Sequence, residues 1–362
     1  MGTTKVALKR GVKQGDPLSP FIFNAIMDPL LEQLETINGY QINDNHTISS
    51  VAFADDLLLL ATTKEDAQQL LLHTEKYLHS MGMKMAATKC TSFEIKKTKN
   101  SWYIADPELH LRDGAHFPFS AADSTLTHLG GHISPWRGLH KNMGTKLEGT
   151  LHRLRSAPLK PHQKLHLLTT FIIPHFLYAN TLAVLPITAI RSMDSLIRVH
   201  VKDFLHLPAS NPNGLLYCSK RDGDLGIPKL ETLCVTTVLR QGITLLNTFD
   251  QTTHALESTK YEQRLERLAK SARIQWPITN FRQLDAYKKN QEEELRQWGA
   301  LPSKGKSIPY FADDRYGNSW LYNPTLLKPC RFLTALSLRS ETTSDRVCLN
   351  KVIPQATTKC RK

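Results

Sequence analysis

The feature that most constrains the fold is a pair of adjacent aspartates between two β-compatible runs. Residues Ile48–Phe53 precede Asp55 and Asp56, and the apolar run Leu57–Ala61 follows them. Such flanks predict a β-hairpin with the two carboxylates at or beside its tip. Adjacent carboxylates repel each other unless a cation or hydrogen bonds compensate. Because Mg²⁺ prefers oxygen ligands, Asp55 and Asp56 are candidate metal ligands.

The tetrapeptide itself carries little weight, because an isolated Asp-Asp pair also suits an ordinary turn. Phe53–Asp56 reads Phe-Ala-Asp-Asp, and Phe311–Asp314 repeats it. No apolar run leaves the second copy, which we predict to be a loop. The sequence around the first copy therefore has to carry any functional inference.

A turn and a helix precede this hairpin. Gly15 marks the turn, and Ser19–Pro20 predicts an N-cap with proline at the first helical position. Apolar residues then recur at helical spacing as far as Leu34, and Asn38–Gly39 is expected to end the helix.

Further local signals follow the hairpin. Thr63 is a predicted helix N-cap, and Gly82 is the glycine expected just beyond the end of that helix. Thr91–Ile95 predicts a short strand, Lys96–Asn100 a loop, and Leu126–Ile133 a second hairpin.

The rest of the chain is predominantly helical by the spacing of its apolar residues. Residues 141–197 and 231–298 predict helices, with a kink at Pro174 and a loop at residues 207–214. Residues 299–362 are less regular.

The formal charge of +13 and the pI of about 9.4 favour polyanionic partners. A basic but otherwise ordinary soluble protein remains an alternative, although clustering of the charge favours nucleic acid. The clusters are Lys84, Lys89, Lys96, Lys97 and Lys99, and Arg137, Lys141, Lys146, Arg153, Arg155, Lys160 and Lys164. Six cysteines without a Cys-x-x-Cys pair or a secretory signal favour a reducing compartment, and no apolar run is long enough for a membrane span.

Taken in order, these motifs resemble those of non-LTR reverse transcriptases. Lys13–Pro20, opening a helix, is similar to motif B, and Phe53–Asp56 to motif C. Gly82–Lys84 with Lys89 resembles motif D, and Leu129–Gly131 resembles motif E, the primer grip. The combination and its order make the resemblance specific.

The resemblance continues into the helical region. Leu159–Leu165, Phe171–Pro174 and Tyr178 look like the thumb of elements that insert into ribosomal RNA genes. Asp222–Pro228 looks like the segment after it, where Asp224 departs from the usual Gly-Gly-Leu-Gly. The implied fold is α+β: a partial right-hand polymerase palm, residues 1–138, a helical thumb, 139–235, and a helical or irregular linker, 236–362, leading to a truncated zinc knuckle.

The resemblance implies an RNA-directed DNA polymerase, a nucleotidyltransferase that uses Mg²⁺ or Mn²⁺, an RNA template, a DNA primer and deoxynucleoside triphosphates. Asp55 would bind the metal, with Asp56 as a weaker or structural contributor. Lys89 would lie near the triphosphate as a charge partner or general acid, or it is a surface lysine. The other implied contacts are with template and nucleotide at Gln14, Gly15, Asp16, Pro17 and Ser19, and with the primer at Leu129, Gly130 and Gly131.

Two expectations concern the ends. The family's motif A carboxylate lies upstream of motif B, where Met1–Arg10 contains no Asp or Glu, so we expect an incomplete metal site and no activity of this chain alone. Cys360 either opens a truncated zinc knuckle or is a simple terminal cysteine. A decayed element, an incomplete gene model or an exon boundary would explain both ends.

Two other interpretations remain open. One is a non-enzymatic basic RNA- or DNA-binding remnant, whose salt-sensitive binding would ignore Asp55 and Asp56. The other is a product without a stable fold. A nuclear location follows from the family role alone.

Overall fold

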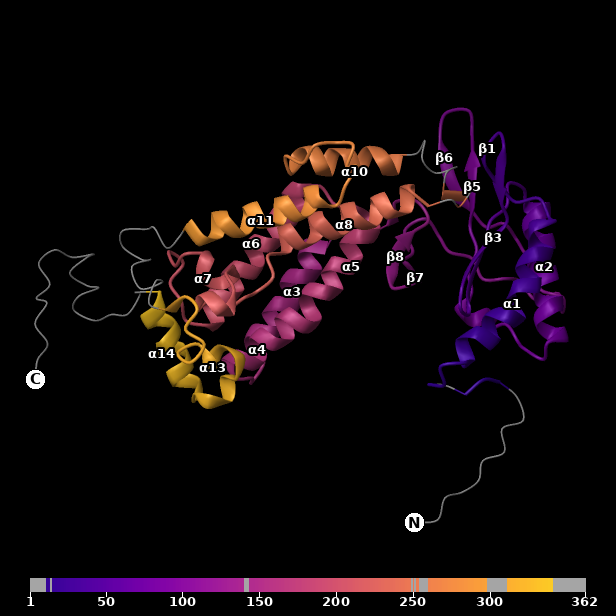
Figure 1. Cartoon of the computed structure of the whole chain (residues 1–362). Helices are drawn as coiled ribbons and strands as arrows, with labels where there is room; N and C mark the ends of the chain where they lie inside the picture. Colours follow the sequence, from indigo (N-terminus) through magenta and orange to yellow (C-terminus); the bar gives the residue numbers. More distant parts are fainter. Residues whose placement is uncertain are drawn as a thin grey trace, which may run out of the picture. The chain divides into compact units, whose positions relative to one another are not determined.

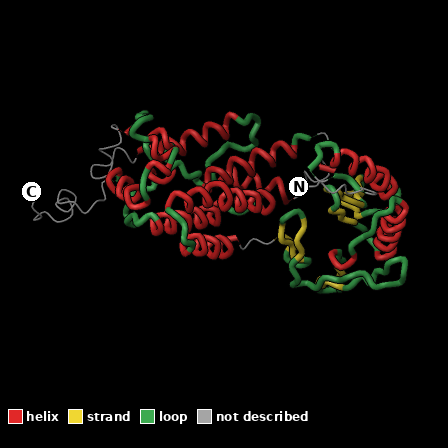
Figure 2. Tube along the Cα trace, turned by 90° about the horizontal axis from the view of Figure 1, so that it is seen from below, coloured by secondary structure: helices red, strands yellow, loops and turns green. Residues whose placement is uncertain are grey.

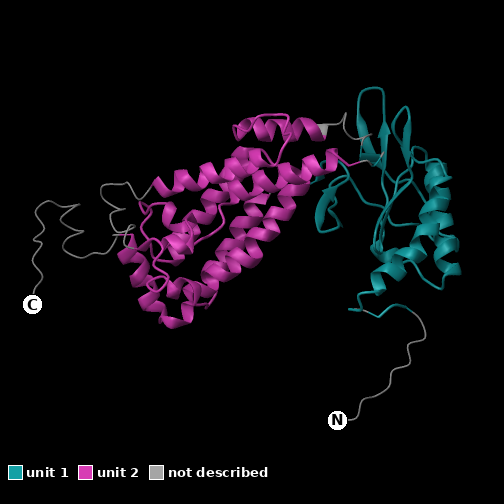
Figure 3. Ribbon diagram, in the orientation of Figure 1, with its two compact units in different colours: residues 1–140, 249–258 teal, residues 141–248, 259–362 magenta. Residues whose placement is uncertain are grey.

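The computed structural model describes residues 11–13, 15–139, 143–248, 250, 252–253, 260–297 and 311–340 (Figure 1). They belong to two compact units, residues 1–140 with 249–258 and residues 141–248 with 259–362 (Figure 3). The described strands are all in the first unit, as small antiparallel sheets, and the second unit is helical (Figure 2). The predicted α+β class, with a helical region after the strands, is confirmed.

Two helices, α1 (Ser19–Glu35) and α2 (Lys64–Ser80), form the core of the first unit by packing against each other. The Tyr77 hydroxyl on α2 donates a hydrogen bond of 2.7 Å to the Ile26 carbonyl on α1. The buried apolar side chains between them are Met27, Leu30, Leu34, Leu70 and Tyr77. Leu57 and Leu59 of the hairpin that contains the aspartate pair pack against this cluster.

The start of α1 differs from the prediction. Leu18, not Ser19, is the N-cap residue, and its side chain makes no capping hydrogen bond. The Ser19 hydroxyl instead donates a hydrogen bond of 2.6 Å to the Lys13 carbonyl in the preceding turn. The hydroxyl that the sequence pattern assigned to capping α1 therefore bonds the preceding turn instead of the helix.

The predicted end of α1 at Asn38–Gly39 is also wrong, because the helix ends at Glu35 with Thr36 as its C-cap. The Thr36 hydroxyl donates to the Gln33 carbonyl at 2.7 Å, which satisfies one of the carbonyls left open in the last turn.

Both predicted ends of α2 are confirmed. The Thr63 hydroxyl accepts a hydrogen bond from the Asp66 N–H at 3.1 Å. Gly82 has φ +71° and donates to the His79 carbonyl, while the Met83 N–H donates to the Leu78 carbonyl. This paired arrangement is the Schellman motif, whose left-handed position glycine occupies without steric cost.

The strands form three two-stranded hairpins and one three-stranded sheet in the described part of the first unit. Their bounds are β1 (Tyr40–Asn43), β2 (His46–Ile48), β3 (Ser50–Phe53), β4 (Asp56–Leu59), β5 (Glu94–Lys97), β6 (Trp102–Ala105), β7 (Leu126–His128), β8 (Gly131–Ser134) and β9 (Gly138–Leu139). The strand predicted at Thr91–Ile95 lies further along, because Lys96 and Lys97 pair with β6 instead of forming a loop.

The second unit is built around α8, which contacts α5, α6, α10 and α11. Its elements are α3 (Met143–Ser156), α4 (Pro161–Leu167), η2 (Leu168–Ile172), α5 (Ile173–Ala183), α6 (Ile187–Phe204), α7 (Gly214–Tyr217), η3 (Lys220–Asp222), α8 (Leu230–Leu246), α10 (Lys260–Ser271), α11 (Arg282–Arg296), α13 (Ser319–Tyr322), η5 (Pro324–Leu326) and α14 (Pro329–Arg339). The predicted division at residue 235 falls inside α8, and the palm, thumb and linker assignments remain predictions.

Pro174 lies directly after a π-helical segment. The helix that begins at Pro161 changes to π geometry over Leu168–Ile172 and returns to α geometry in α5. Proline lacks an N–H and crowds the carbonyl four residues earlier, so an irregular turn is expected at this point. No helix in the described residues is long and apolar enough to cross a membrane.

Candidate metal-binding hairpin and nucleic-acid interface

The predicted hairpin around the aspartate pair is present. β3 and β4 pair antiparallel with Phe53 opposite Asp56, so Ala54 and Asp55 form a two-residue turn. Ala54 has φ +52°, in the left-handed region that alanine rarely adopts. Asp55 is therefore at the tip, and Asp56 is the first residue of β4.

The hairpin has one face on the core and one face in solvent. Leu57 and Leu59 pack against the α1–α2 cluster. Val51 and Leu58, which are register partners, are exposed, and the Phe53 side chain is 67% exposed. Side chains alternate between the two faces of a strand. Leu57 and Leu59 therefore anchor one face of the hairpin on the core, and the opposite, apolar face is exposed.

The chemistry of the hairpin tip suits a hard cation. Asp55 and Asp56 are both exposed and offer carboxylate oxygens, the ligands that Mg²⁺ prefers. Within the described residues, no group of three or more His, Cys, Asp or Glu side chains could hold a metal ion. The two aspartates therefore fit a divalent cation as partial ligands, with waters and substrate phosphates among the remaining positions.

The turn before α1 holds the residues predicted to contact template and nucleotide. The Asp16 carboxylate accepts a hydrogen bond from the Leu18 N–H at 2.9 Å, so it is used within the turn itself. Gly15 has φ +87° and no heavy atom within 4 Å of where a Cβ would be. Pro17 is exposed, and Gln14 lies outside the described residues. Gly15 thus leaves open space for a close approach to the backbone.

Lys89 is the last residue of the short 3-10 helix η1 (Ala87–Lys89), and its side chain is exposed. No hydrogen bond or ion pair within the described residues joins it to Asp55 or Asp56. Its role at the triphosphate remains a prediction.

The second predicted hairpin, at Leu126–Ile133, is confirmed, while its role as a primer grip remains a prediction. Leu129 and Gly130 form the turn between β7 and β8, with φ values of +47° and +73°. Positive φ at both central residues is typical of a type I′ turn, which Asn-Gly usually forms. Gly131 follows as the first residue of β8, opposite His128. Because leucine rarely adopts positive φ, the backbone at Leu129 is strained.

The second Phe-Ala-Asp-Asp tetrapeptide is part of a loop, as predicted. Asp313, rather than the alanine, has positive φ, and its carboxylate pairs with the Arg221 guanidinium. The Asp314 carboxylate accepts hydrogen bonds from the N–H groups of Tyr316, at 3.1 Å, and Gly317, at 2.9 Å. Both carboxylates are therefore occupied by contacts within the second unit.

Some of the predicted basic surface of the second unit is used for internal contacts. Arg155 on α3 pairs with Asp203 on α6 at 2.5 Å, and the Lys164 ammonium donates to the Arg155 carbonyl. Arg153 and Lys160 are exposed, and Lys141 lies outside the described residues. The surface on α3 and α4 remains basic, although two of its members also position helices.

Exposed aromatic rings lie on the same helical segment. Phe171 in η2 is 60% exposed and Tyr178 in α5 is 46% exposed, with exposed His175 between them. Aromatic side chains beside cationic ones are typical of surfaces on which nucleic-acid bases or sugars pack. The sequence resemblance had singled out Phe171 and Tyr178, and the structure shows that both rings face solvent.

A polar pocket of about 380 Å³ in the second unit was not found from the sequence. Its lining comes from four helices and the turn after α10: Arg191, Lys229, Glu231, Ser271, Ala272, Arg273, Tyr287, Gln291 and Glu294. No local motif could have indicated it, because single residues from distant segments converge there.

Comparison with known proteins gives a consistent result. Residues 2–131 match the family model of the reverse transcriptase (RNA-dependent DNA polymerase) domain. A retrovirus-related Pol polyprotein from the type-1 retrotransposable element R2 of Nasonia vitripennis is 34% identical over 231 residues, which is 62% of this chain and 22% of that protein. The Pol polyprotein of the type-2 element R2DM of Drosophila melanogaster is 34% identical over 233 residues, 64% of this chain and 22% of that protein.

A third relative, from the R2 element of Popillia japonica, is 34% identical over 229 residues, which is 63% of this chain and 32% of that protein. The chain thus spans between a fifth and a third of the length of these relatives.

Proposed function

We propose, from the premise that this chain carries a reverse transcriptase domain related to the Pol polyproteins of R2 non-LTR retrotransposons, that it provides the metal-binding hairpin and the thumb of an RNA-directed DNA polymerase. Reverse transcriptases generally use Mg²⁺, a nucleic-acid template and primer, and deoxynucleoside triphosphates. The observation that carries the proposal is the β3–β4 hairpin, which presents Asp55 and Asp56 in solvent at its tip.

At this hairpin, Asp55 would be the principal ligand and Asp56 a secondary one. A bound Mg²⁺, or Mn²⁺ in its place, supplies Lewis-acid activation of the primer 3′ oxygen and neutralises the leaving pyrophosphate. The anchoring of Leu57 and Leu59 on the helices holds the tip in place, so the carboxylates would not need to reorganise during the reaction.

Other residues of the first unit would position the nucleic acid. Gly15, with its open left-handed backbone, would lie under the templating base pair, beside Gln14, Asp16, Pro17 and Ser19. The β7–β8 turn, Leu129–Gly131, would grip the primer, and Lys89 would face the triphosphate. In the second unit, the basic and aromatic surface of α3 to α5 would contact the backbone of the nucleic acid.

Two-metal catalysis needs more carboxylate ligands than the hairpin supplies. We therefore propose that a further carboxylate, outside the described residues, completes the site during catalysis, and that Asp55 and Asp56 alone do not support turnover.

The test is primer extension on an RNA template with Mg²⁺, comparing the chain with Asp55→Asn and with Asp314→Asn. The second variant is a control for the loss of a carboxylate, because Asp314 belongs to the other tetrapeptide and its carboxylate only closes a loop. Extension that Asp55→Asn abolishes and Asp314→Asn preserves would support the polymerase assignment and would overturn the proposal that a further carboxylate is needed. Extension that persists in Asp55→Asn would sink the assignment of the hairpin.

A second candidate function is binding of RNA or DNA without catalysis. It is favoured by the exposed rings of Phe171 and Tyr178 and the exposed basic residues of α3 and α4 in the second unit, because these residues do not depend on the hairpin. Primer–template binding without extension, equal in the chain and in Asp55→Asn, would support this function for the polypeptide alone. A nuclear location remains part of the proposal, and imaging of the tagged chain in cells tests it.

A further inference from the structure

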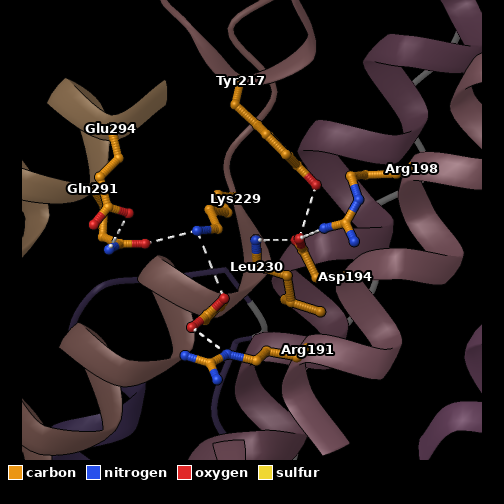
Figure 4. A network of polar contacts seen from close by, with 9 residues as sticks. Arg191, Asp194, Arg198, Tyr217, Lys229, Leu230, Gln291 and Glu294 are labelled. Carbon is orange, nitrogen blue, oxygen red and sulfur yellow. Dashed lines mark hydrogen bonds and ion pairs between the residues drawn. The ribbon is translucent and has the colours of Figure 1, made fainter. Parts of the chain in front are cut away.

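Side chains that line the polar pocket of the second unit form a network of polar contacts with one another (Figure 4). The Glu231 carboxylate binds the Arg191 guanidinium through Nε at 2.8 Å and the Lys229 ammonium at 3.6 Å. Lys229 also donates to the Gln291 side-chain oxygen at 2.7 Å, and the Gln291 amide nitrogen donates to Glu294 at 3.2 Å. These contacts join residues of α6, α8 and α11 along the lining of the pocket.

The lining has an excess of positive charge. It contains three cations, Arg191, Lys229 and Arg273, and two carboxylates, Glu231 and Glu294, which leaves a net charge of +1. A single carboxylate, Glu231, serves both Arg191 and Lys229. The pocket can therefore accept one negative charge without burying an uncompensated anion.

Two guanidinium groups remain available for a ligand. Arg191 uses only Nε for Glu231, and its side chain is 56% exposed, so the other N–H donors of its fork make no contact with the described residues. Arg273 is exposed and has no ion-pair partner within the described part of the chain. Arg273 lies just after α10 and has φ +60°, a left-handed conformation that arginine rarely adopts. This residue turns the chain along one side of the pocket.

An aromatic side chain and hydroxyl groups complete the lining. Burial raises the pKa of Tyr287 to about 12, so its hydroxyl is a neutral donor at physiological pH. Tyr287 and Ser271 line the same pocket as the two arginines, and the Tyr287 side chain packs partly against the hydrophobic core. Guanidinium groups and an aromatic side chain in one pocket suit a phosphate attached to a sugar and a base.

We propose that this pocket binds a phosphodiester of a nucleic-acid strand, with Arg191 and Arg273 donating to the phosphate oxygens and Tyr287 packing against the adjoining nucleotide. A phosphodiester carries one negative charge, which matches the charge that the lining leaves uncompensated. A strand is favoured over a free nucleotide, because the same unit carries the exposed basic and aromatic surface of α3 to α5. This site is separate from the catalytic hairpin and does not depend on it.

The experiment measures binding of a fluorescein-labelled oligothymidylate of about 20 nucleotides to the full chain by fluorescence anisotropy over a range of salt concentrations. Arg273→Gln is expected to weaken binding about tenfold, the loss of one charge-assisted hydrogen-bonding group. The slope of log affinity against log salt should fall by about 0.7, the value for one phosphate contact on a single strand. Arg273→Lys should retain most of that slope.

Arg282→Gln is the matched control. Arg282 is exposed on α11 and does not line the pocket, so removing its charge should change neither affinity nor slope. Thermal unfolding followed by circular dichroism checks that each variant is folded. Equal effects of Arg273→Gln and Arg282→Gln, or no effect of either, would overturn the proposal.

Two further arms identify the source of the phosphate. Thymidine monophosphate and inorganic phosphate are each titrated as competitors of the labelled strand for binding to the chain. If the monophosphate binds in an Arg273-dependent manner while strand binding is unchanged by Arg273→Gln, the pocket serves a free nucleotide and the proposal for a strand fails. Asp55→Asn should bind the strand as the unaltered chain does, so failure of this site and failure of the polymerase assignment are distinguishable.

Discussion

The Asp194 carboxylate binds the Arg198 guanidinium at 2.6 Å, one helical turn further along α6. The same carboxylate accepts hydrogen bonds from the Tyr217 hydroxyl and the Leu230 N–H, both at 2.9 Å (Figure 4). Asp194 is 1% exposed, and burial raises its pKa and that of Tyr217. One buried group thus joins α6 to the segment of α7 and to the start of α8.

Asp194→Ala should lower the free energy of unfolding by about 3 kcal/mol, because it leaves Arg198 and two donors without their shared acceptor. Chemical denaturation monitored by circular dichroism measures this loss. Asp203→Ala is the control on the same helix. Its pair with Arg155 is about half exposed on both sides, so the change should cost less than about 1 kcal/mol. Equal costs at the two sites would contradict the assigned role of Asp194.

Thr63→Ala should destabilise the first unit by about 1 kcal/mol, because it removes the acceptor for the Asp66 N–H at the start of α2. Ser19→Ala should cost less than about 0.5 kcal/mol, since Ser19 does not cap α1 and its bond to Lys13 is exposed. Hydrogen exchange in the first turn of each helix resolves the two effects. A larger loss for Ser19→Ala than for Thr63→Ala would disprove the capping assignments.

Leu129→Asn should stabilise the β7–β8 hairpin by about 1 kcal/mol, because asparagine adopts positive φ more readily than leucine and Asn-Gly suits this turn. Slower hydrogen exchange of the backbone amides of Leu126–Ser134 would show this stabilisation. Gly130→Ala is the opposite control and should speed exchange, since φ is +73° there. If the leucine grips the primer, Leu129→Asn should also weaken primer–template binding. Faster exchange in Leu129→Asn would rule out strain at this turn.

Cys234 should resist alkylation in the folded protein at pH 8, while Cys330 reacts. Cys234 is fully buried, and burial raises the pKa of its thiol to about 12, so almost none of it is thiolate at that pH. Cys330 is exposed on α14. Peptide mass mapping after a short iodoacetamide treatment, with and without denaturant, gives the site-specific rates. Labelling of Cys234 as fast as Cys330 without denaturant would show that the core around α8 opens readily.

Local interactions made much of the first unit predictable. The hairpins at β3–β4 and β7–β8, and both ends of α2, depend on contacts within a few residues, so turn chemistry and capping patterns were sufficient. The same reasoning failed at the start of α1. There the pattern allowed Ser19 to cap the helix, but the helix begins one residue earlier than the pattern implied, with Leu18 as N-cap, and the Ser19 hydroxyl donates to the Lys13 carbonyl.

The two Phe-Ala-Asp-Asp tetrapeptides separate what the sequence determined from what only the tertiary structure decided. Sequence flanks determined that Asp55 lies at a hairpin tip and that Asp313 lies in a loop. Only the folded chain brought Arg221, 92 positions away, to the Asp313 carboxylate, and gathered Arg191 and Arg273 around one pocket. Hydrogen bonds within a turn follow from neighbouring residues, whereas pairings between distant charges depend on how helices pack, which apolar burial over the whole unit decides.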